Sequence, residues 1–286
     1  MTLYHRKFVV ALLFMKGGSF FITTLKKGKV YIMQEELKYY EEIKDWDFSM
    51  FEIESESLTN WDFFETLKKI ADKNARILDL GTGGGEKVLK YYPDCKEILG
   101  TDFSKGMIET ANKNLEESGR CNIKFRLMDN LKMDVPENYY DIVTARHTVT
   151  DPKQIYKCLK EGGYLLIKGV DKADCWSLKM IFNRGQGFND VKEMSLIDYE
   201  NVLNAGFKDV ELIPLYEKDY YKNRIIFKEF LKKVPIIDEF SEENGDNKDY
   251  YAKDLEDDLL DAYIKDNTYN GKIRMLRRYY GIIARK

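Results

Sequence analysis

Short apolar runs alternate with amphipathic stretches through the middle of this chain. Apolar runs bounded by turn residues predict strands, and apolar positions that recur every three to four residues predict helices. The pattern predicts strands near 75–80, 96–101, 122–128, 139–145 and 163–169, and helices over 85–92, 104–118 and 152–160. This alternation predicts an α/β fold built on a doubly wound parallel sheet.

Further elements are expected on both sides of this region. They are helices over 34–44, 58–72 and 195–205, followed by a strand over 207–216. Short polar side chains satisfy the free N–H groups of a first helical turn, so we expect Thr59 or Asn60, Ser104 and Ser195 to cap three of the helices. Gly206 is expected to end the third helix.

A glycine-rich turn carries the main chemical signal. The strand near 75–80 ends in Gly81-Thr82-Gly83-Gly84-Gly85, where missing Cβ atoms allow a ligand to approach the backbone closely. Asp102 follows 21 residues after Gly81, at the end of the next apolar run. A carboxylate in that position can accept hydrogen bonds from both ribose hydroxyls. The glycine turn and Asp102 together predict a nucleoside-bearing cofactor at the carboxyl ends of the parallel strands.

The spacing of the glycines restricts the choice of cofactor. A dinucleotide fingerprint reads G-x-G-x-x-G, whereas this turn reads G-x-G-x-G and is followed by Glu86. A carboxylate in the first turn of the helix would repel a pyrophosphate, and no Gly-Lys-Ser/Thr follows as in a Walker loop. These features disfavour a nicotinamide-dependent dehydrogenase and a nucleoside triphosphatase.

The pattern D-x-G-x-G-x-G over 79–85 resembles motif I of the class I S-adenosylmethionine (SAM) methyltransferases, and is closest to their type 11 group. Later motifs follow in the family's order, among them Leu159-Lys160-Glu161-Gly162-Gly163, with Glu161 where many members have proline. The resemblance covers roughly 60–216 and the last strand, expected over 273–283. It implies a Rossmann-like seven-stranded sheet with an antiparallel last strand, SAM as cofactor and a small-molecule methyl acceptor.

The resemblance also implies roles for individual residues. Asp102 matches the residue that binds the ribose, and Asp129 matches the one that contacts the adenine amino group, with Asn130 beside it. Phe103 and Met107 match the apolar residues that flank the adenine. The remaining cofactor residues come from motif I and are Asp79, Gly81, Thr82, Gly83 and Gly85.

Two polar residues follow the fourth strand. His147 is the candidate general base, because its ordinary pKa suits proton transfer near neutrality; alternatively it orients a loop or packs on the substrate. Arg146 is a candidate for binding the SAM carboxylate or an anionic substrate; the alternative is a surface salt bridge. Methyl transfer needs a base only when the acceptor must lose a proton early.

Composition limits partners and location. The net charge of −3 disfavours broad nucleic-acid binding, and no stretch of 18 apolar residues predicts a membrane-spanning helix. Four widely spaced cysteines fit a reducing cytoplasm, and two histidines with no clustered partners predict no metal site. The oligomeric state is not predicted.

The chain is expected to divide at residue 33. Residues 1–32 carry six basic side chains and no acidic one. They are interpreted as an extension upstream of a true start at Met33; a signal peptide and a short added element are the alternatives. Residues 33–286 form one expected domain, with its core over 60–216 and 272–286. An insertion over 217–271 has expected helices over 225–234 and 249–265 and forms either a lid or a dimer contact.

Two other functions remain open from the sequence. The exit of the fourth strand reads Ala145-Arg146-His147-Thr148 and lacks the Asn/Asp-Pro-Pro-Tyr/Phe motif of enzymes that methylate exocyclic amines of nucleic acids. This disfavours an RNA methyltransferase without excluding one, and a protein methyltransferase also stays open. A non-catalytic SAM-binding module would share every cofactor motif.

Overall fold

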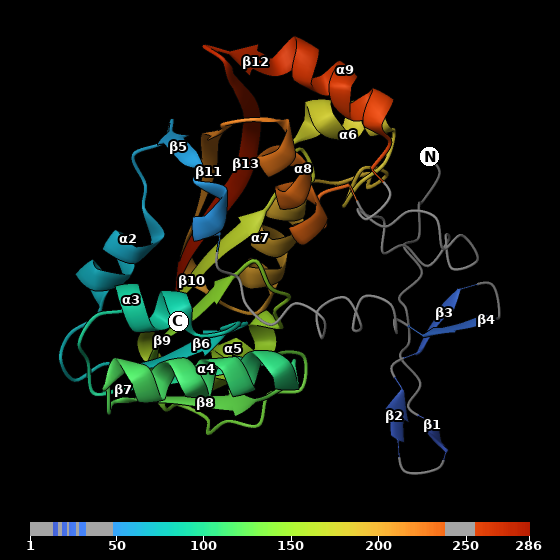
Figure 1. Ribbon diagram of the computed structural model, residues 1–286. Helices are drawn as coiled ribbons and strands as arrows, with labels where there is room; N and C mark the ends of the chain where they lie inside the picture. Colours follow the sequence, from blue (N-terminus) through green and yellow to red (C-terminus); the bar gives the residue numbers. More distant parts are fainter. Residues whose placement is uncertain (1–13, 17–18, 22, 27–28, 33–47, 238–254) are drawn as a thin grey trace.

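A computed structural model gives the structure of the chain (Figure 1). It describes residues 14–16, 19–21, 23–26, 29–32, 48–237 and 255–286. The helix expected over 34–44, and the first part of the one expected over 249–265, lie outside these ranges. Before residue 33 the structure has two short hairpins, which pair β1 (Phe14–Lys16) with β2 (Ser19–Phe21) and β3 (Thr23–Lys26) with β4 (Lys29–Ile32).

One sheet organises the rest of the described chain. Its strands are β5 (Glu54–Ser57), β6 (Arg76–Leu80), β7 (Glu97–Asp102), β8 (Ile123–Leu127), β9 (Tyr140–Arg146), β10 (Leu159–Val170), β11 (Lys208–Tyr221), β12 (Thr268–Tyr269) and β13 (Lys272–Arg285). They run in the order β5-β11-β13-β10-β9-β6-β7-β8, with β12 paired to β13. The strands from β8 to β10 are parallel, and β13 is antiparallel to both neighbours. The expected α/β fold and antiparallel last strand are confirmed, and β5 and β12 extend the expected seven strands.

Helices cover both faces of this sheet. They are η1 (Ser49–Phe51), α2 (Phe63–Ile70), α3 (Glu86–Tyr91), α4 (Lys105–Ser118), α5 (Pro152–Cys158), α6 (Trp176–Phe182), α7 (Met194–Asn204), α8 (Arg224–Lys233) and α9 (Asp257–Asn267). The apolar sides of α2, α3 and α4 pack on one face of the sheet, and those of α5 and α7 pack on the other (Figure 1). None of these helices combines the length and apolar character needed to cross a bilayer.

A third apolar core lies beyond the end of β10. It joins η1, α6, α8 and α9 to the ends of β11 and β13, around fully buried residues such as Tyr221, Phe227 and Met275 (Figure 1). Here β11 continues to Tyr221, past the expected core boundary at 216, because it stays paired with β13 over its whole length. The helices between β11 and β13 therefore stand at the end of the sheet where the parallel strands finish.

Helix caps differ from the sequence-based expectation at two of three places. Ser104 accepts a hydrogen bond from the Met107 N–H at 3.3 Å and caps α4 as expected. Helix α2 begins later than expected, and Asp62 caps it in place of Thr59 or Asn60. Ser195 lies inside α7, where its hydroxyl donates to Asp171 at 2.5 Å. Because the hydroxyl bonds to Asp171, which is distant in sequence, the expected cap does not form.

The buried ion pair of Arg277 on β13 generates a prediction for stability. The Arg277 guanidinium donates to both carboxylate oxygens of Asp174 at 3.0 Å, and to Asp219 at 3.3 Å. Arg277 and Asp174 are 7% and 2% exposed. Removing one partner leaves a buried charge poorly compensated. We expect Asp174→Ala to lower the free energy of unfolding in urea by about 3–5 kcal/mol.

The control for this prediction is an exposed ion pair. Glu65→Ala removes the pair with Lys68 on the surface of α2, and should change stability by less than about 1 kcal/mol. Equal effects of the two substitutions would contradict the importance of the buried pair.

Candidate functional site

The glycine turn stands where β6 ends and α3 begins. Gly81, Gly83 and Gly85 have φ values of +70°, +58° and +78°, in the left-handed region that glycine tolerates best. A Cβ atom on Gly81 would lie 2.6 Å from the Cβ of Thr148, and one on Gly85 would lie 2.7 Å from the Phe125 ring. Both the conformation and the close packing therefore require glycine at these two positions.

Asp102 fastens this turn to the end of β7. Its Oδ2 accepts the Gly83 N–H at 2.9 Å, and its Oδ1 accepts the Ser104 N–H at 2.9 Å. The side chain is 8% exposed; burial raises the pKa of this carboxyl, and the two backbone hydrogen bonds oppose the shift. Each carboxylate oxygen keeps a lone pair for another donor. The structure thus brings Asp102 and the glycine turn together, and the ribose contact stays a prediction.

The Asp79 side chain is bound by other protein side chains. Its Oδ1 accepts hydrogen bonds from the hydroxyls of Tyr92 at 2.5 Å and Thr144 at 2.8 Å, and the residue is 3% exposed. Burial raises the pKa of Asp79, against the positive charge of Arg146. These contacts make Asp79 a support for the turn, through the end of α3 and through β9.

The loop after β8 brings two more expected residues to the same edge. The Asn130 amide donates to Thr148 Oγ1 at 3.0 Å and to the Val149 carbonyl at 3.3 Å, which joins this loop to the one after β9. Asp129 accepts the Leu131 N–H at 2.9 Å through one oxygen.

The two apolar residues expected beside the adenine differ in accessibility. Phe103 is 45% exposed just beyond the end of β7, whereas Met107 is 2% exposed within α4. Phe103 therefore presents surface at the carboxyl edge, and Met107 belongs to the packing beneath it.

Unsatisfied polar atoms test whether SAM suits this edge. Asn130 Oδ1 and Arg146 Nε are buried and have no hydrogen-bond partner in the part of the chain that the structure describes. Buried polar groups normally have partners, so such a group calls for an explanation. SAM carries ribose hydroxyls, an ammonium and a carboxylate, which are complementary to the Asn130 oxygen, the Asp102 carboxylate and the Arg146 guanidinium. The residues present fit this cofactor.

Arg146 ends β9 beside the first turn of α2. Its guanidinium lies 5.1 Å from the Phe64 ring centroid and 5.8 Å from that of Phe63. No carboxylate in the described ranges forms an ion pair with it, which argues against the alternative of a surface salt bridge. A cation held on aromatic rings with an unpaired Nε is suited to binding an anionic group.

His147 follows directly, in a left-handed conformation with φ of +53°. Its N–H donates to the Lys168 carbonyl at 2.8 Å, which holds the backbone at the ends of β9 and β10. By accessible surface the residue is exposed, although the protein around the ring partly desolvates the imidazole. This desolvation, with the charges of Arg146, Lys168 and Arg277, holds the pKa of His147 well below its usual range. The imidazole is therefore neutral at pH 7, with a free lone pair, but it is a weaker base than an unperturbed imidazole.

Sequence reasoning did not identify Tyr279 as part of the site. Its ring centroid lies 5.4 Å from that of His147, 4.6 Å from Lys168 Nζ and 4.9 Å from the Arg277 guanidinium carbon. Burial raises the pKa of Tyr279 well above its usual value, so the phenol stays protonated and can donate a hydrogen bond. Tyr279 pairs with Val170 across β13 and β10, and this register carries no sequence signal of its own.

The low pKa of His147 can be measured by NMR. The chain has two histidines, so a His5→Gln variant leaves a single imidazole to titrate. We expect its carbon-bound proton signals to stay at the neutral position through pH 6.5 and to move only well below it. Since the unfolded chain binds this proton near pH 6.5 and the folded chain does not, His147 lowers folding stability as the pH falls below 6.5. A midpoint at or above 6.5 would contradict the electrostatic environment described here.

Comparison with known proteins finds a match to a methyltransferase domain in the central part of the chain. Residues 71–205 match the family model described as a methyltransferase domain. An uncharacterized methyltransferase of Bacillus subtilis, YcgJ, is 26% identical over 149 residues, which are 48% of this chain and 59% of the relative. Phosphoethanolamine N-methyltransferase 1 of Triticum aestivum is 30% identical over 168 residues, 51% of this chain and 32% of the relative. The chain thus spans less than two thirds of each of these two relatives.

A third relative and a solved structure agree with this assignment. The ubiquinone/menaquinone biosynthesis C-methyltransferase UbiE of Rickettsia bellii is 26% identical over 187 residues, 62% of this chain and 68% of the relative. The crystal structure of a putative methyltransferase from Bacillus halodurans has the same fold, with a TM-score of 0.54 and 18% identity over 78% of this chain and 98% of that one. The match of residues 71–205 to a methyltransferase domain, the methyltransferase relatives and the shared fold support the expected class I SAM-dependent methyltransferase.

Proposed function

We propose that this chain transfers the methyl group of SAM to a small-molecule acceptor. The observation that carries the proposal is the contact between Asp102 and the glycine turn, with unsatisfied polar atoms around it. A buried carboxylate with spare acceptor capacity suits a ribose, and the carboxylate of Glu86 nearby disfavours a pyrophosphate.

The proposed cofactor contacts follow from position at the carboxyl edge. Asp102 accepts the ribose hydroxyls, and Phe103 covers one face of the adenine. Asp129 accepts the adenine amino group through its second oxygen. Arg146 binds the carboxylate at the other end of the cofactor, because it ends β9 at this edge and forms no ion pair with any described residue.

The transfer step needs mainly positioning. When bound, SAM supplies a methyl group already activated by the sulfonium, and holding two reactants in line can contribute about 7–11 kcal/mol. His147 accepts a proton from the acceptor where the chemistry requires it. The protonated phenol of Tyr279 beside it can hold the acceptor by a hydrogen bond.

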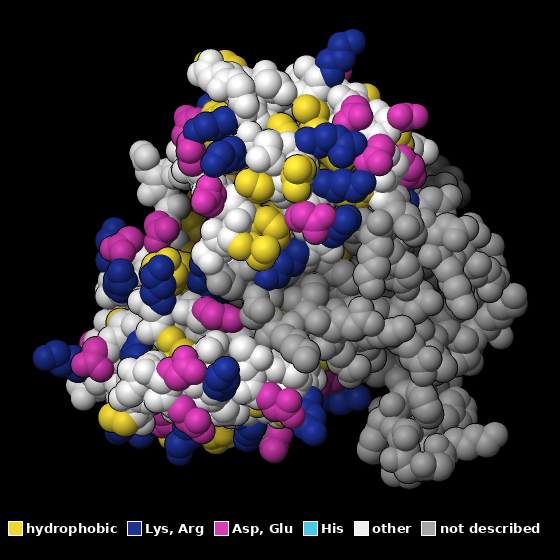
Figure 2. All heavy atoms as spheres, in the orientation of Figure 1, with side chains coloured by type: hydrophobic (Ala, Val, Ile, Leu, Met, Phe, Trp, Pro, Cys, Tyr) yellow, Lys and Arg dark blue, Asp and Glu magenta, His cyan; other side chains and the backbone are white. Residues whose placement is uncertain are grey.

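Three observations favour a small acceptor over a nucleic acid. The relatives named above include enzymes named for phosphoethanolamine and for ubiquinone or menaquinone biosynthesis. Basic and acidic side chains are interspersed over the face in Figure 2, whereas a nucleic-acid surface needs a field of one sign. The third apolar core stands beside the exit of β10, at the end of the sheet where the acceptor must arrive, which favours an enclosed acceptor. All four cysteines are free, which favours the cytoplasm.

Removing the Asp102 carboxylate tests the cofactor site. We expect Asp102→Ala to weaken binding of S-adenosylhomocysteine by at least about tenfold in calorimetry, because the ribose hydroxyls lose a charged acceptor. Asp94→Ala is the matched control, since Asp94 is exposed before β7, at the opposite end of the sheet. Equal affinities of the two folded variants would sink the assignment of Asp102.

Replacing His147 tests the transfer step. A screen of metabolite pools with methyl-labelled SAM identifies the acceptor, and turnover is then compared in His147→Ala. For an acceptor that loses a proton, we expect kcat to fall by about 10²–10⁴-fold while affinity for S-adenosylhomocysteine stays unchanged. Full turnover in the variant would remove His147 from the mechanism. Binding of SAM without transfer to any pool would favour the non-catalytic module.

A further inference from the structure

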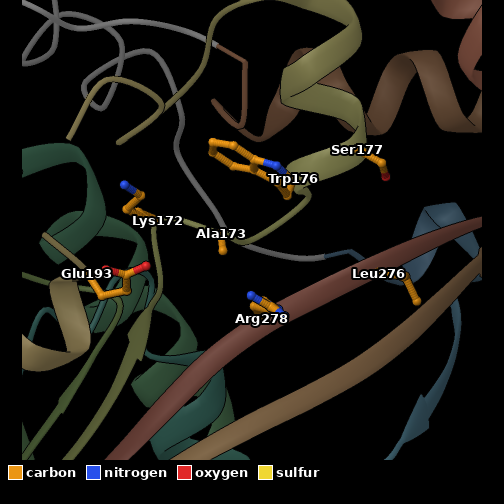
Figure 3. Close-up of a pocket in the computed structure, with 7 residues that line it drawn as sticks. All are labelled: Lys172, Ala173, Trp176, Ser177, Glu193, Leu276 and Arg278. Carbon is orange, nitrogen blue, oxygen red and sulfur yellow. The ribbon is translucent and has the colours of Figure 1, made fainter. Parts of the chain in front are cut away.

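A cavity of about 520 Å³ lies beside the first half of β13 (Figure 3). Its walls include Lys172 and Trp176 from the segment after β10, Glu193 before α7, and Leu276 and Arg278 on β13. The volume is within the range of pockets that bind small molecules. None of these residues belongs to the methyl-transfer site proposed above.

The sheet itself separates the cavity from that site. Successive side chains of a strand point to opposite faces, so Leu276 and Arg278 face one way and Arg277 and Tyr279 the other. Tyr279 lies beside His147, whereas Arg278 faces the cavity. Figure 3 shows Arg278 and Trp176 on opposite walls of this space. A ligand bound there would be divided from His147 by β13.

The charges that line the cavity favour an anion. The Arg278 guanidinium lies 5.3 Å from the Tyr216 ring centroid and has no ion pair within the described ranges. The Lys172 ammonium donates to the main-chain carbonyl of Asp190 and forms no ion pair with any described residue. Glu193 is the one acidic residue in the lining. The cavity therefore has two cations against one carboxylate.

The apolar part of the wall favours a flat, apolar ligand body. Trp176 is 38% exposed, and Phe188 supports its ring at a centroid distance of 5.3 Å and an interplanar angle of 30°. Leu276, which also lines the cavity, is 46% exposed. An aromatic ring between these side chains would remove apolar surface from water on both sides.

We propose that this cavity is a binding site for a small aromatic anion, separate from the site of methyl transfer. Arg278 binds the carboxylate or phosphate of the ligand through its planar guanidinium, and Lys172 adds a second positive charge. Trp176 and Leu276 enclose the ring. The inference does not depend on the proposed function, because none of its residues contributes to the cofactor edge.

Calorimetry with defined probes tests the proposal on the full chain. The probes are 2-naphthoate and 2-naphthyl phosphate, which distinguish the two anionic groups, and 2-naphthalenemethanol, which is neutral. We expect at least one anion to bind, and the neutral alcohol to bind at least about tenfold more weakly. Saturating S-adenosylhomocysteine should leave the affinity of the anion unchanged. Failure of both anions to bind, equal binding of the alcohol, or displacement by S-adenosylhomocysteine would each overturn the proposal.

Substitutions then locate the probe. We expect Arg278→Gln to weaken binding of the anionic probe at least about tenfold, and Trp176→Leu to weaken its binding several-fold. Glu193→Gln should strengthen it, because the one repulsive charge is removed. Arg285→Gln is the matched control, since Arg285 is an exposed arginine at the other end of β13. An Arg278 variant that is folded and binds like the control, or weaker binding in Glu193→Gln, would overturn the proposal.

Discussion

The Asp102 carboxylate holds together the edge of the sheet on which the functional account depends. It accepts N–H groups from Gly83, in the turn after β6, and from Ser104, at the start of α4. Two parallel strands and the helix after each are thus fixed to one buried charge. The hydrogen bonds keep the carboxylate available for a ligand, and the left-handed glycines leave the turn narrow enough for this contact.

The length of β13 creates two environments. Because β13 and β11 continue beyond β10, the third apolar core and the ionic group around Arg277 can form outside the family's central sheet. One face of β13 supplies Tyr279 to the exit of β9 and β10. The other supplies Arg278 to a separate cavity. A single extended strand therefore contributes to both proposed sites, one on each face of the sheet.

The elements between residues 75 and 160 could be predicted closely, because apolar periodicity, glycine chemistry and helix caps are local signals. Observed ends there differ from the expected ones by at most two residues, except that β10 begins at Leu159 and was expected to begin at 163. The signals fail where partners are distant in sequence. All four residues of β5 are exposed, and that strand exists through its pairing with β11. Ser195 does not cap α7, because its hydroxyl donates to Asp171 instead. Tyr279 reaches the site only because of the register between β10 and β13. The cofactor residues were predicted from motif order, which carries family information that pairing and burial do not.

The central claim is that the glycine turn and Asp102 receive a nucleoside without a pyrophosphate. Parallel calorimetric titrations of the folded chain with S-adenosylhomocysteine and with NAD test it most directly, at one pH and ionic strength. We expect saturable binding of S-adenosylhomocysteine with one site per chain, and no detectable binding of NAD. Binding of NAD with no response to S-adenosylhomocysteine would contradict it.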